Sequence, residues 1–195
     1  MSAEALYDSL KTICTRRRSI RRFSEKPLSI EQIAAIREVA GTAPYASGKK
    51  NWDLLVVTDR NVIRELAGTV QLRSSNLGKQ VRDDFRGMFL EYAEHFTAFE
   101  TAPALFIPVY KVQHSLSLML DEVNEEIIQW ERDNFVKSIS CVAMLVLLAA
   151  ESLGLGGCYM TGPIIAGQDL SKQLPLRKGY EIAAIIPVGY PQGDN

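Results

Sequence analysis

The residues best suited to chemistry are arginines gathered near the start of the chain. Five of them fall within seven consecutive positions, with no acidic residue among them, around the hydroxyl of Ser19. Guanidinium groups and a hydroxyl are the donors that a phosphate prefers, and each charge-assisted hydrogen bond contributes about 1.5–3 kcal/mol. The pattern fits a phosphate-binding site, and it also fits a solvated basic patch. The cluster consists of Arg16, Arg17, Arg18, Arg21 and Arg22.

The charge balance of the whole chain narrows the choice of ligand. Lys and Arg total 22 against 23 Asp and Glu in 195 residues, which gives a net charge of −1. Outside the arginine cluster, 17 basic residues stand against 23 acidic ones. A protein that binds nucleic acid is normally more basic than this. The sequence therefore favours a small anionic ligand and predicts no nucleic-acid partner.

Motifs for other cofactors and for metals are missing from the sequence. The glycines at 154, 156 and 157 do not form a dinucleotide-binding pattern, because Tyr159 stands where the third glycine belongs. Neither a P-loop nor a zinc-protease motif occurs, and His95 and His114 have no histidine four residues away. We therefore expect both histidines at the surface rather than as ligands or bases, and we predict no metal site.

Cysteine content and hydropathy point to the cytoplasm. Cys14, Cys141 and Cys158 are odd in number and lack C-x-x-C spacing, as expected in a reducing compartment. The first residues lack the apolar core of a signal peptide. The longest apolar run, residues 141–150, is shorter than the roughly 20 residues that span a bilayer. We expect a cytoplasmic protein with no membrane partner, in which Cys158 acts as a small hydrophobic residue.

The elements that would position these residues alternate between helices and strands. Ser29 and Gln32 predict a capping box at the start of one helix, and Gly41 marks its end. Pro108 places one strand at a sheet edge or a bulge. The order indicates one domain over residues 1–195, either α/β or α+β, with helices flanking one sheet. Helices are predicted over 4–16, 30–40, a short segment after Asp59, 76–98, 116–134 and 135–153; strands are predicted over 52–58, 104–110 and 182–190; residues 19–23 are predicted to be extended and 42–51 to form a loop.

The helix over 135–153 carries information about assembly. From Ile139 onward nearly every face of this helix is apolar, so it must be covered on all sides. A single chain of this size can do so, but a dimer interface does so more easily. Trp130 and Phe135, near its start, fit either the border of a pocket or the core.

Four segments, taken in order, resemble the nitroreductase family of FMN-dependent reductases. They are RRRSIRRF at 16–23, APYASGKKNW at 43–52 with the VVTD strand after it, LLAAESLGLGGCYMTGP at 147–163, and IPVGYP at 186–191. The resemblance implies an α+β sandwich whose central mixed, largely antiparallel sheet is flanked by helices. It also implies a homodimer with shared FMN sites.

The family likeness implies a role for each matching residue near the start of the chain. Arg17, Arg18 and Ser19 would hold the FMN phosphate. Arg21 would reach the ribityl chain and the N1/O2 edge of the ring, where a cation stabilises the charge of the reduced flavin.

Two further segments are implied to contact the flavin ring. Pro44, Tyr45 and Ala46 would come from the other subunit and line its far side. Met160, Thr161 and Gly162 would pass close to N5 and O4, with Gly162 leaving room for the approach.

Three positions depart from the family pattern. Residues 45–48 replace small or polar residues and an Asn, which removes one amide contact. No Lys or Arg follows Lys178, where many members complete the phosphate site, so the arginine cluster would bind the phosphate alone. Leu145 stands where the apolar helix commonly carries Asn, which affects packing.

The implied activity is transfer of electrons from NADH or NADPH through flavin N5 to a small-molecule acceptor, such as a nitroaromatic or a quinone, by a ping-pong scheme. Such a scheme requires no acidic or basic side chain for its central step, so we name no catalytic residue. Two alternatives stay open. One is a flavoenzyme with a different dedicated substrate, for example in dehalogenation, and the other is a flavin-binding protein with little turnover.

Overall fold

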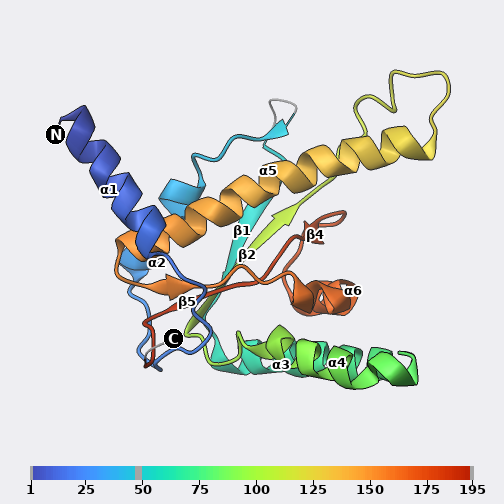
Figure 1. The fold of residues 1–195 in the computed structure, drawn as a ribbon. Coiled ribbons are helices and arrows are strands. Elements are labelled where there is room, and N and C mark those ends of the chain that lie inside the picture. Colours follow the sequence, from blue (N-terminus) through green and yellow to red (C-terminus); the bar gives the residue numbers. More distant parts are fainter. Residues whose placement is uncertain (1, 47–49, 194–195) are drawn as a thin grey trace.

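A computed structural model describes residues 2–46 and 50–193, so positions 47–49 of the predicted loop lie outside the described residues. Figure 1 shows a central sheet between two layers of helices. The strands are β1 (Trp52–Val57), β2 (Ala104–Tyr110), β3 (Gly156–Gly157), β4 (Glu181–Ile182) and β5 (Ile186–Gly189). The helices are α1 (Ala3–Arg16), α2 (Ile30–Ala40), α3 (Arg60–Gly78), α4 (Asp83–Glu94), α5 (Glu125–Ser152) and α6 (Gly167–Gln173), with the 3-10 helices η2 (His95–Thr97) and η3 (Gly162–Ala166).

The sheet has the order β1-β2-β5-β3, with β4 also paired to β2, and every strand pair is antiparallel. One isolated parallel bridge, between Ser19 and Gly157, adds the segment after α1 to the edge. The predicted mixed, largely antiparallel sheet flanked by helices is therefore confirmed.

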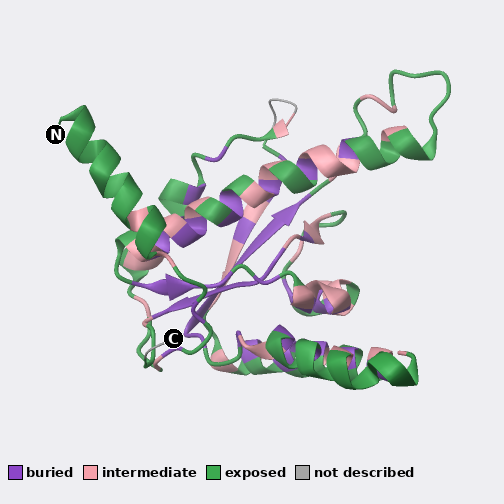
Figure 2. Cartoon of the chain, viewed as in Figure 1, coloured by how far each residue is buried: buried purple, intermediate pink, exposed green. Residues whose placement is uncertain are grey.

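Alternation along β2 explains the two layers. Leu105 and Ile107 belong to the core on one face with α3 and α6, whereas Ala104 and Phe106 belong to the core on the other face with α2 and α5. Successive side chains of a strand point to opposite faces, so one apolar strand serves both cores. Figure 2 shows β2 buried throughout, between the helical layers.

The predicted helix over 76–98 is wrong because it runs across a turn. The chain breaks at 79–82 between α3 and α4, which pack against each other. The guanidinium of Arg86 donates to the carbonyls of Gly78 at 3.2 Å and Val81 at 3.3 Å, so it satisfies the end of α3. The helix after Asp59 is long rather than short, because it extends to Gly78.

The predicted boundary between helices over 116–134 and 135–153 is also wrong. A single helix, α5, begins at Glu125 and continues to Ser152, while residues 111–124 contain no helix. Asn124 caps it by accepting from the N–H of Ile127 at 3.0 Å, and two glutamates in the first turn suit the helix dipole.

Pro108 lies in a central strand, so its predicted place at an edge is wrong and the predicted bulge is the better description. Between the paired positions of β4 and β5, residues 183–185 face only Ile107 and Pro108. The Pro108 carbonyl accepts from the N–H of Ala183 at 2.9 Å, while its missing N–H falls at this irregularity. The same irregularity splits the predicted 182–190 strand into β4 and β5.

The capping box predicted for α2 is confirmed. The Ser29 hydroxyl accepts from the Gln32 N–H at 3.2 Å, and the Gln32 side chain accepts from the Ser29 N–H at 3.0 Å. The predicted helix at the chain start is confirmed as α1, which ends at Arg16.

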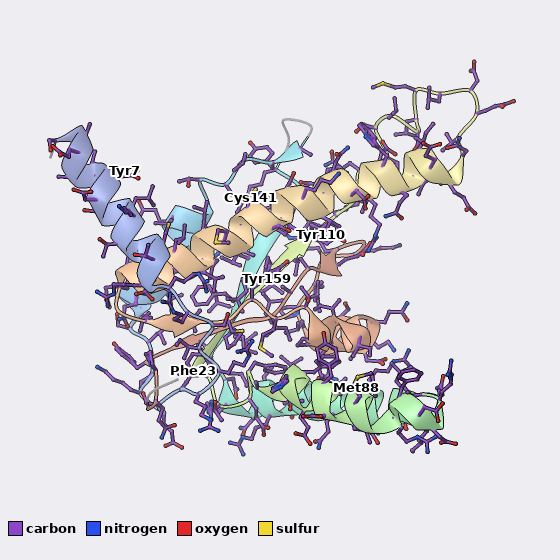
Figure 3. The ribbon with its side chains drawn as sticks, viewed as in Figure 1. Tyr7, Phe23, Met88, Tyr110, Cys141 and Tyr159 are labelled. Carbon is purple, nitrogen blue, oxygen red and sulfur yellow. The ribbon has the colours of Figure 1, made fainter. Side chains whose placement is uncertain are left out.

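Helices α1 and α5 are among those that leave apolar side chains uncovered. Helix α1 has no buried residue and extends from the body with Tyr7 in solvent (Figures 1 and 3). Val136 and Met144 of α5 are also exposed. Among the described residues, α5 alone meets the length and composition of a membrane span, with a mean hydropathy of 1.7 over 18 residues. A core helix passes the same test, and α5 packs Ile139 and Val146 against the sheet.

Candidate functional site

The arginine segment is fixed at the edge of the sheet by backbone hydrogen bonds. The Ile20 N–H donates to the carbonyl of Gly157 at 3.0 Å, and the Ser24 N–H donates to that of Tyr190 at 2.9 Å. Ile20 and Phe23 are buried, while Arg21 and Arg22 stay exposed. The backbone of the segment is thus hydrogen-bonded to β3 and to the residue after β5, while its guanidinium groups stay at the surface.

A glycine allows this close approach. A Cβ on Gly156 would lie 2.5 Å from Cγ1 of Ile20, a distance that real Cβ atoms essentially never show. Gly156 therefore lets β3 come beside the arginine segment. Phe23 forms an antiparallel bridge with Pro191, two residues after the end of β5.

The arginines divide by what they contact. Arg16 pairs with Glu151 at 3.4 Å, and Nη1 of Arg18 donates to the carbonyl oxygen of Thr15 at 2.6 Å, at the end of α1. Within residues 2–46 and 50–193, neither Arg17 nor Arg21 forms an ion pair. Arg22 forms none either in this part of the chain, so Arg17, Arg21 and Arg22 are free to receive an anion, whereas Arg18 already serves the helix end.

The segment after β3 comes beside Arg21. Met160 exchanges backbone hydrogen bonds with Ile185, at 3.1 and 3.0 Å, which anchors it to the sheet. A hollow of about 140 Å³ is lined by Arg21 together with Met160, Thr161 and Gly162. The fold thus brings together residues from opposite ends of the chain that the sequence assigned to one site.

The structure gives Gly162 a reason different from the predicted one. A Cβ on Gly162 would overlap the ring of Phe96, which packs edge-on against Tyr92 with ring centroids 4.9 Å apart. Gly162 is therefore needed for the packing of η2 against η3, whatever else approaches it.

Five residues that line the hollow were not predicted from the sequence; they are Tyr92, His95, Phe96, Tyr159 and Pro163. Tyr92 and His95 are both exposed, so His95 lies at the surface as expected but beside Arg21. Their spacing of three residues places them on one side of a helix, which could have drawn attention to the pair. Cys158, another lining residue, is buried as predicted.

Pro44, Tyr45 and Ala46 do not line this hollow in the part of the chain that the structure describes. The Ala46 N–H donates to the Ser138 hydroxyl at 3.1 Å, which attaches the loop to α5. Ala46 borders another cavity, of about 550 Å³, between the first half of that helix and the 113–119 segment. Their predicted contact with a flavin of the other subunit stays a prediction.

The residues present fit a flavin mononucleotide in two respects. Arg17 and Arg21 are cations without an acidic partner among the described residues, as a phosphate and a reduced ring require. Thr161 directly precedes η3 and Gly162 is its first residue, and the first N–H groups of a helix have no partner within it. These groups can donate to a polar ring edge.

Comparison with known proteins finds a family profile and individual relatives. The profile of the Nitroreductase family matches residues 14–190. Iodotyrosine deiodinase of Nematostella vectensis is 26% identical over 99% of this chain, and iodotyrosine deiodinase 1 of Rattus norvegicus is 26% identical over 98% of it. This chain spans 69% of the length of the first protein and 64% of the second.

Two solved structures share the fold. A BluB-like flavoprotein from Clostridium difficile 630 superimposes with a TM-score of 0.85 at 23% identity, covering 95% of this chain and 91% of the other. A nitroreductase with bound FMN from Desulfitobacterium hafniense DCB-2 superimposes with a TM-score of 0.75 at 18% identity, covering 96% and 91%. With its profile match extending from the arginine segment to the last strand, this chain belongs to the nitroreductase family.

Proposed function

We propose that this chain binds FMN and acts as an oxidoreductase that takes electrons from NADH or NADPH and passes them to a nitroaromatic, a quinone or a similar acceptor. The observation that carries the proposal is the placement of Arg21 against Met160–Gly162, with Arg17 free of acidic partners among the described residues. Membership of the nitroreductase family supports it.

The protein's own residues would bind and orient the cofactor. Arg17 and Ser19 would hold the phosphate, and Arg21 would stabilise negative charge at the ring. The backbone of Thr161 and Gly162 would donate to the polar edge of the ring. Bound FMN supplies the electron transfer, so no acidic or basic side chain is required at its centre, and water can deliver protons.

The proposal includes a homodimer with shared FMN sites in the cytoplasm. Pro44–Ala46 do not border the Arg21 hollow within the described part of one chain, and α5 exposes Val136 and Met144. A second copy of the chain would bring its own Pro44–Ala46 loop to the hollow and would cover the exposed side chains of α5. Cys14, Cys141 and Cys158 are free thiols, as expected in a reducing compartment.

A second candidate reaction is reductive dehalogenation of a dedicated aromatic substrate. Two relatives that align with nearly the whole chain are named iodotyrosine deiodinases, from an anemone and from rat. The same flavin chemistry would serve, with the acceptor pocket deciding between the two reactions.

The first experiment is an absorbance spectrum of the purified protein, before and after addition of FMN and desalting. We expect flavin bands that stay with the protein at about one flavin per chain. Loss of all flavin on desalting would contradict the proposed cofactor. The loaded protein is then assayed with NADH and NADPH against a quinone, a nitroaromatic and a halogenated phenol. No turnover of any acceptor by a fully loaded protein would favour the flavin-binding alternative.

Light scattering on the same sample tests the assembly. We expect a mass of twice the 21.7 kDa chain. A stable monomer that retains FMN would contradict a site shared between two chains.

A further inference from the structure

The Arg21 hollow has a second side that the proposed function does not use. Arg21 and Met160–Gly162 come from the edge of the sheet, whereas Tyr92, His95 and Phe96 come from the end of α4 and from η2. We infer that the His95 side chain binds the polar edge of the flavin ring, by accepting a hydrogen bond from the ring N3–H. The inference deepens the proposed function and rests on it, since it takes FMN as the ligand of the hollow.

The size of the hollow limits which part of a flavin can enter it. A volume of about 140 Å³ admits one edge of a three-ring system rather than the whole of it. The proposed function already directs the polar edge of the ring to this place, because Thr161 and Gly162 offer backbone N–H groups and Arg21 offers a cation. Any further contact from the lining therefore falls on the same edge.

The hydrogen-bonding groups of that edge show what the sheet side lacks. A guanidinium and backbone N–H groups only donate, so they suit the carbonyl oxygens of the ring and its N1 and N5. The same edge also carries one donor, the N3–H between the two carbonyl groups. A neutral imidazole has one ring nitrogen that accepts, which a guanidinium does not. His95 therefore supplies an acceptor for N3–H, opposite the donors of the sheet side.

Packing fixes the backbone of His95 beside Gly162. The next residue, Phe96, is buried, and a Cβ on Gly162 would overlap its ring. Phe96 also packs edge-on against Tyr92, with ring centroids 4.9 Å apart. The His95 carbonyl accepts from the Ala98 N–H at 3.3 Å, at the end of η2. Because adjacent Cα atoms are about 3.8 Å apart, the backbone of His95 cannot leave the hollow unless Phe96 is unpacked.

The His95 side chain is available to a ligand. It is exposed, and within residues 2–46 and 50–193 it forms no ion pair. Phe96 belongs to the core on the α3 side of the sheet, whereas α5 belongs to the core on the other side. The segment that carries His95 thus lies on the face opposite α5, whose exposed side chains the proposed homodimer covers.

The test is a fluorescence titration of the full chain with FMN and with riboflavin, which has the same ring and no phosphate. We expect His95→Leu to weaken both flavins about fivefold, the effect of one ordinary hydrogen bond. His95→Gln keeps an acceptor and should stay within about twofold of the wild type. Glu94→Leu, at the preceding position but outside the lining, is the matched control and should change neither affinity. All three variants should keep the wild-type melting temperature, because both positions are exposed.

An FMN methylated at N3 tests the atom that His95 contacts. The wild type should bind this analogue more weakly than FMN, and His95→Leu should reduce that difference about fivefold, since the variant has no acceptor to lose. If the wild type and His95→Leu prefer FMN over the analogue by the same factor, His95 does not contact N3 and the inference is overturned.

The phosphate variant separates this inference from the proposed function. Arg17→Ala should weaken FMN and leave riboflavin unchanged, whereas His95→Leu acts on both. If Arg17→Ala behaves in this way while His95→Leu binds both flavins as the wild type does, the proposed function stands and the inference alone is wrong. If Tyr92→Phe rather than His95→Leu weakens both flavins, the acceptor is the tyrosine hydroxyl and the inference is again wrong. If the wild type binds no flavin, the proposed cofactor fails and the inference fails with it.

Discussion

Two walls, one that carries Arg21 and one that carries Leu116, border separate cavities and are held in place by different means. The wall that carries Arg21 and Met160 is fixed by main-chain hydrogen bonds to Gly157 and Ile185 and by glycines that allow close packing. The wall that carries Leu116 belongs to a loop that one carboxylate, Glu131, holds against α5. The first wall is part of the sheet edge, and the second is attached to a helix by side chains.

This difference fits the two kinds of ligand proposed. A cofactor common to a family needs a surface that few substitutions can move, and main-chain bonds provide one, because they do not depend on side-chain identity. A surface that selects an acceptor has to differ between relatives. A loop held by one side chain can be rebuilt by a few substitutions without disturbing the core.

The largest expected effect comes from overpacking the first wall. Gly156→Ala places a methyl group against Ile20, and we expect a loss of about 1–3 kcal/mol in the free energy of unfolding, measured by urea denaturation. Gly87→Ala is the control, because a Cβ there meets nothing within 4 Å on an exposed helix, and it should raise stability by up to about 1 kcal/mol.

A double variant shows whether the crowding is the cause. Gly156→Ala combined with Ile20→Ala should cost less than the sum of the two single changes, since the second removes the atoms with which the first collides. If the losses of stability in the two single variants simply add in the double variant, then Ile20 does not restrict the residue at position 156. In that case close packing does not fix the wall that carries Arg21.

The next effect is on cofactor affinity. Arg17→Ala should weaken FMN binding about tenfold or more, with the fold retained, because it removes an unpaired guanidinium from the proposed phosphate site. Arg16→Ala is the matched control, since that side chain pairs with Glu151 and should leave affinity within about twofold. The measurement is a flavin titration followed by fluorescence, and equal affinities for the wild type and the Arg17 variant would remove Arg17 from the site.

Features set by neighbouring residues could be predicted from the sequence, whereas features set by more distant side chains could not. Local signals predicted the helix after Ser29, the apolar strand at 104–110 and the arginine segment, because capping boxes, apolar runs and charge clusters act over a few residues. The turn at 79–82 was missed because Arg86 stabilises it from the following helix. The start of α5 was missed because the Asn124 cap was overlooked in a polar stretch.

The same distinction applies to the two walls: residues within family motifs were predicted, and contacts without a motif were not. Arg21 and Met160–Gly162 were assigned together from family motifs, and the fold places them around one hollow. The link between Glu131 and the loop had no motif, because an acidic residue on a mixed helix face usually lies in water. Its burial depends on how the 114–117 segment folds back, which no local pattern specifies.

The smallest effect is a response of the second wall to acid. The folded-state pKa of Glu131 lies below its ordinary value of 4.5, so its stabilising contribution is present above that value and is lost as pH falls through the folded-state pKa. Amide hydrogen exchange of the 111–124 segment, corrected for the intrinsic rate, should therefore accelerate only at pH values below 4.5, while that of β2 does not. In Glu131→Gln the segment should exchange faster at neutral pH and show no such step. A step of equal size in that variant would assign the response to other carboxylates, and the loop would no longer depend on a single side chain.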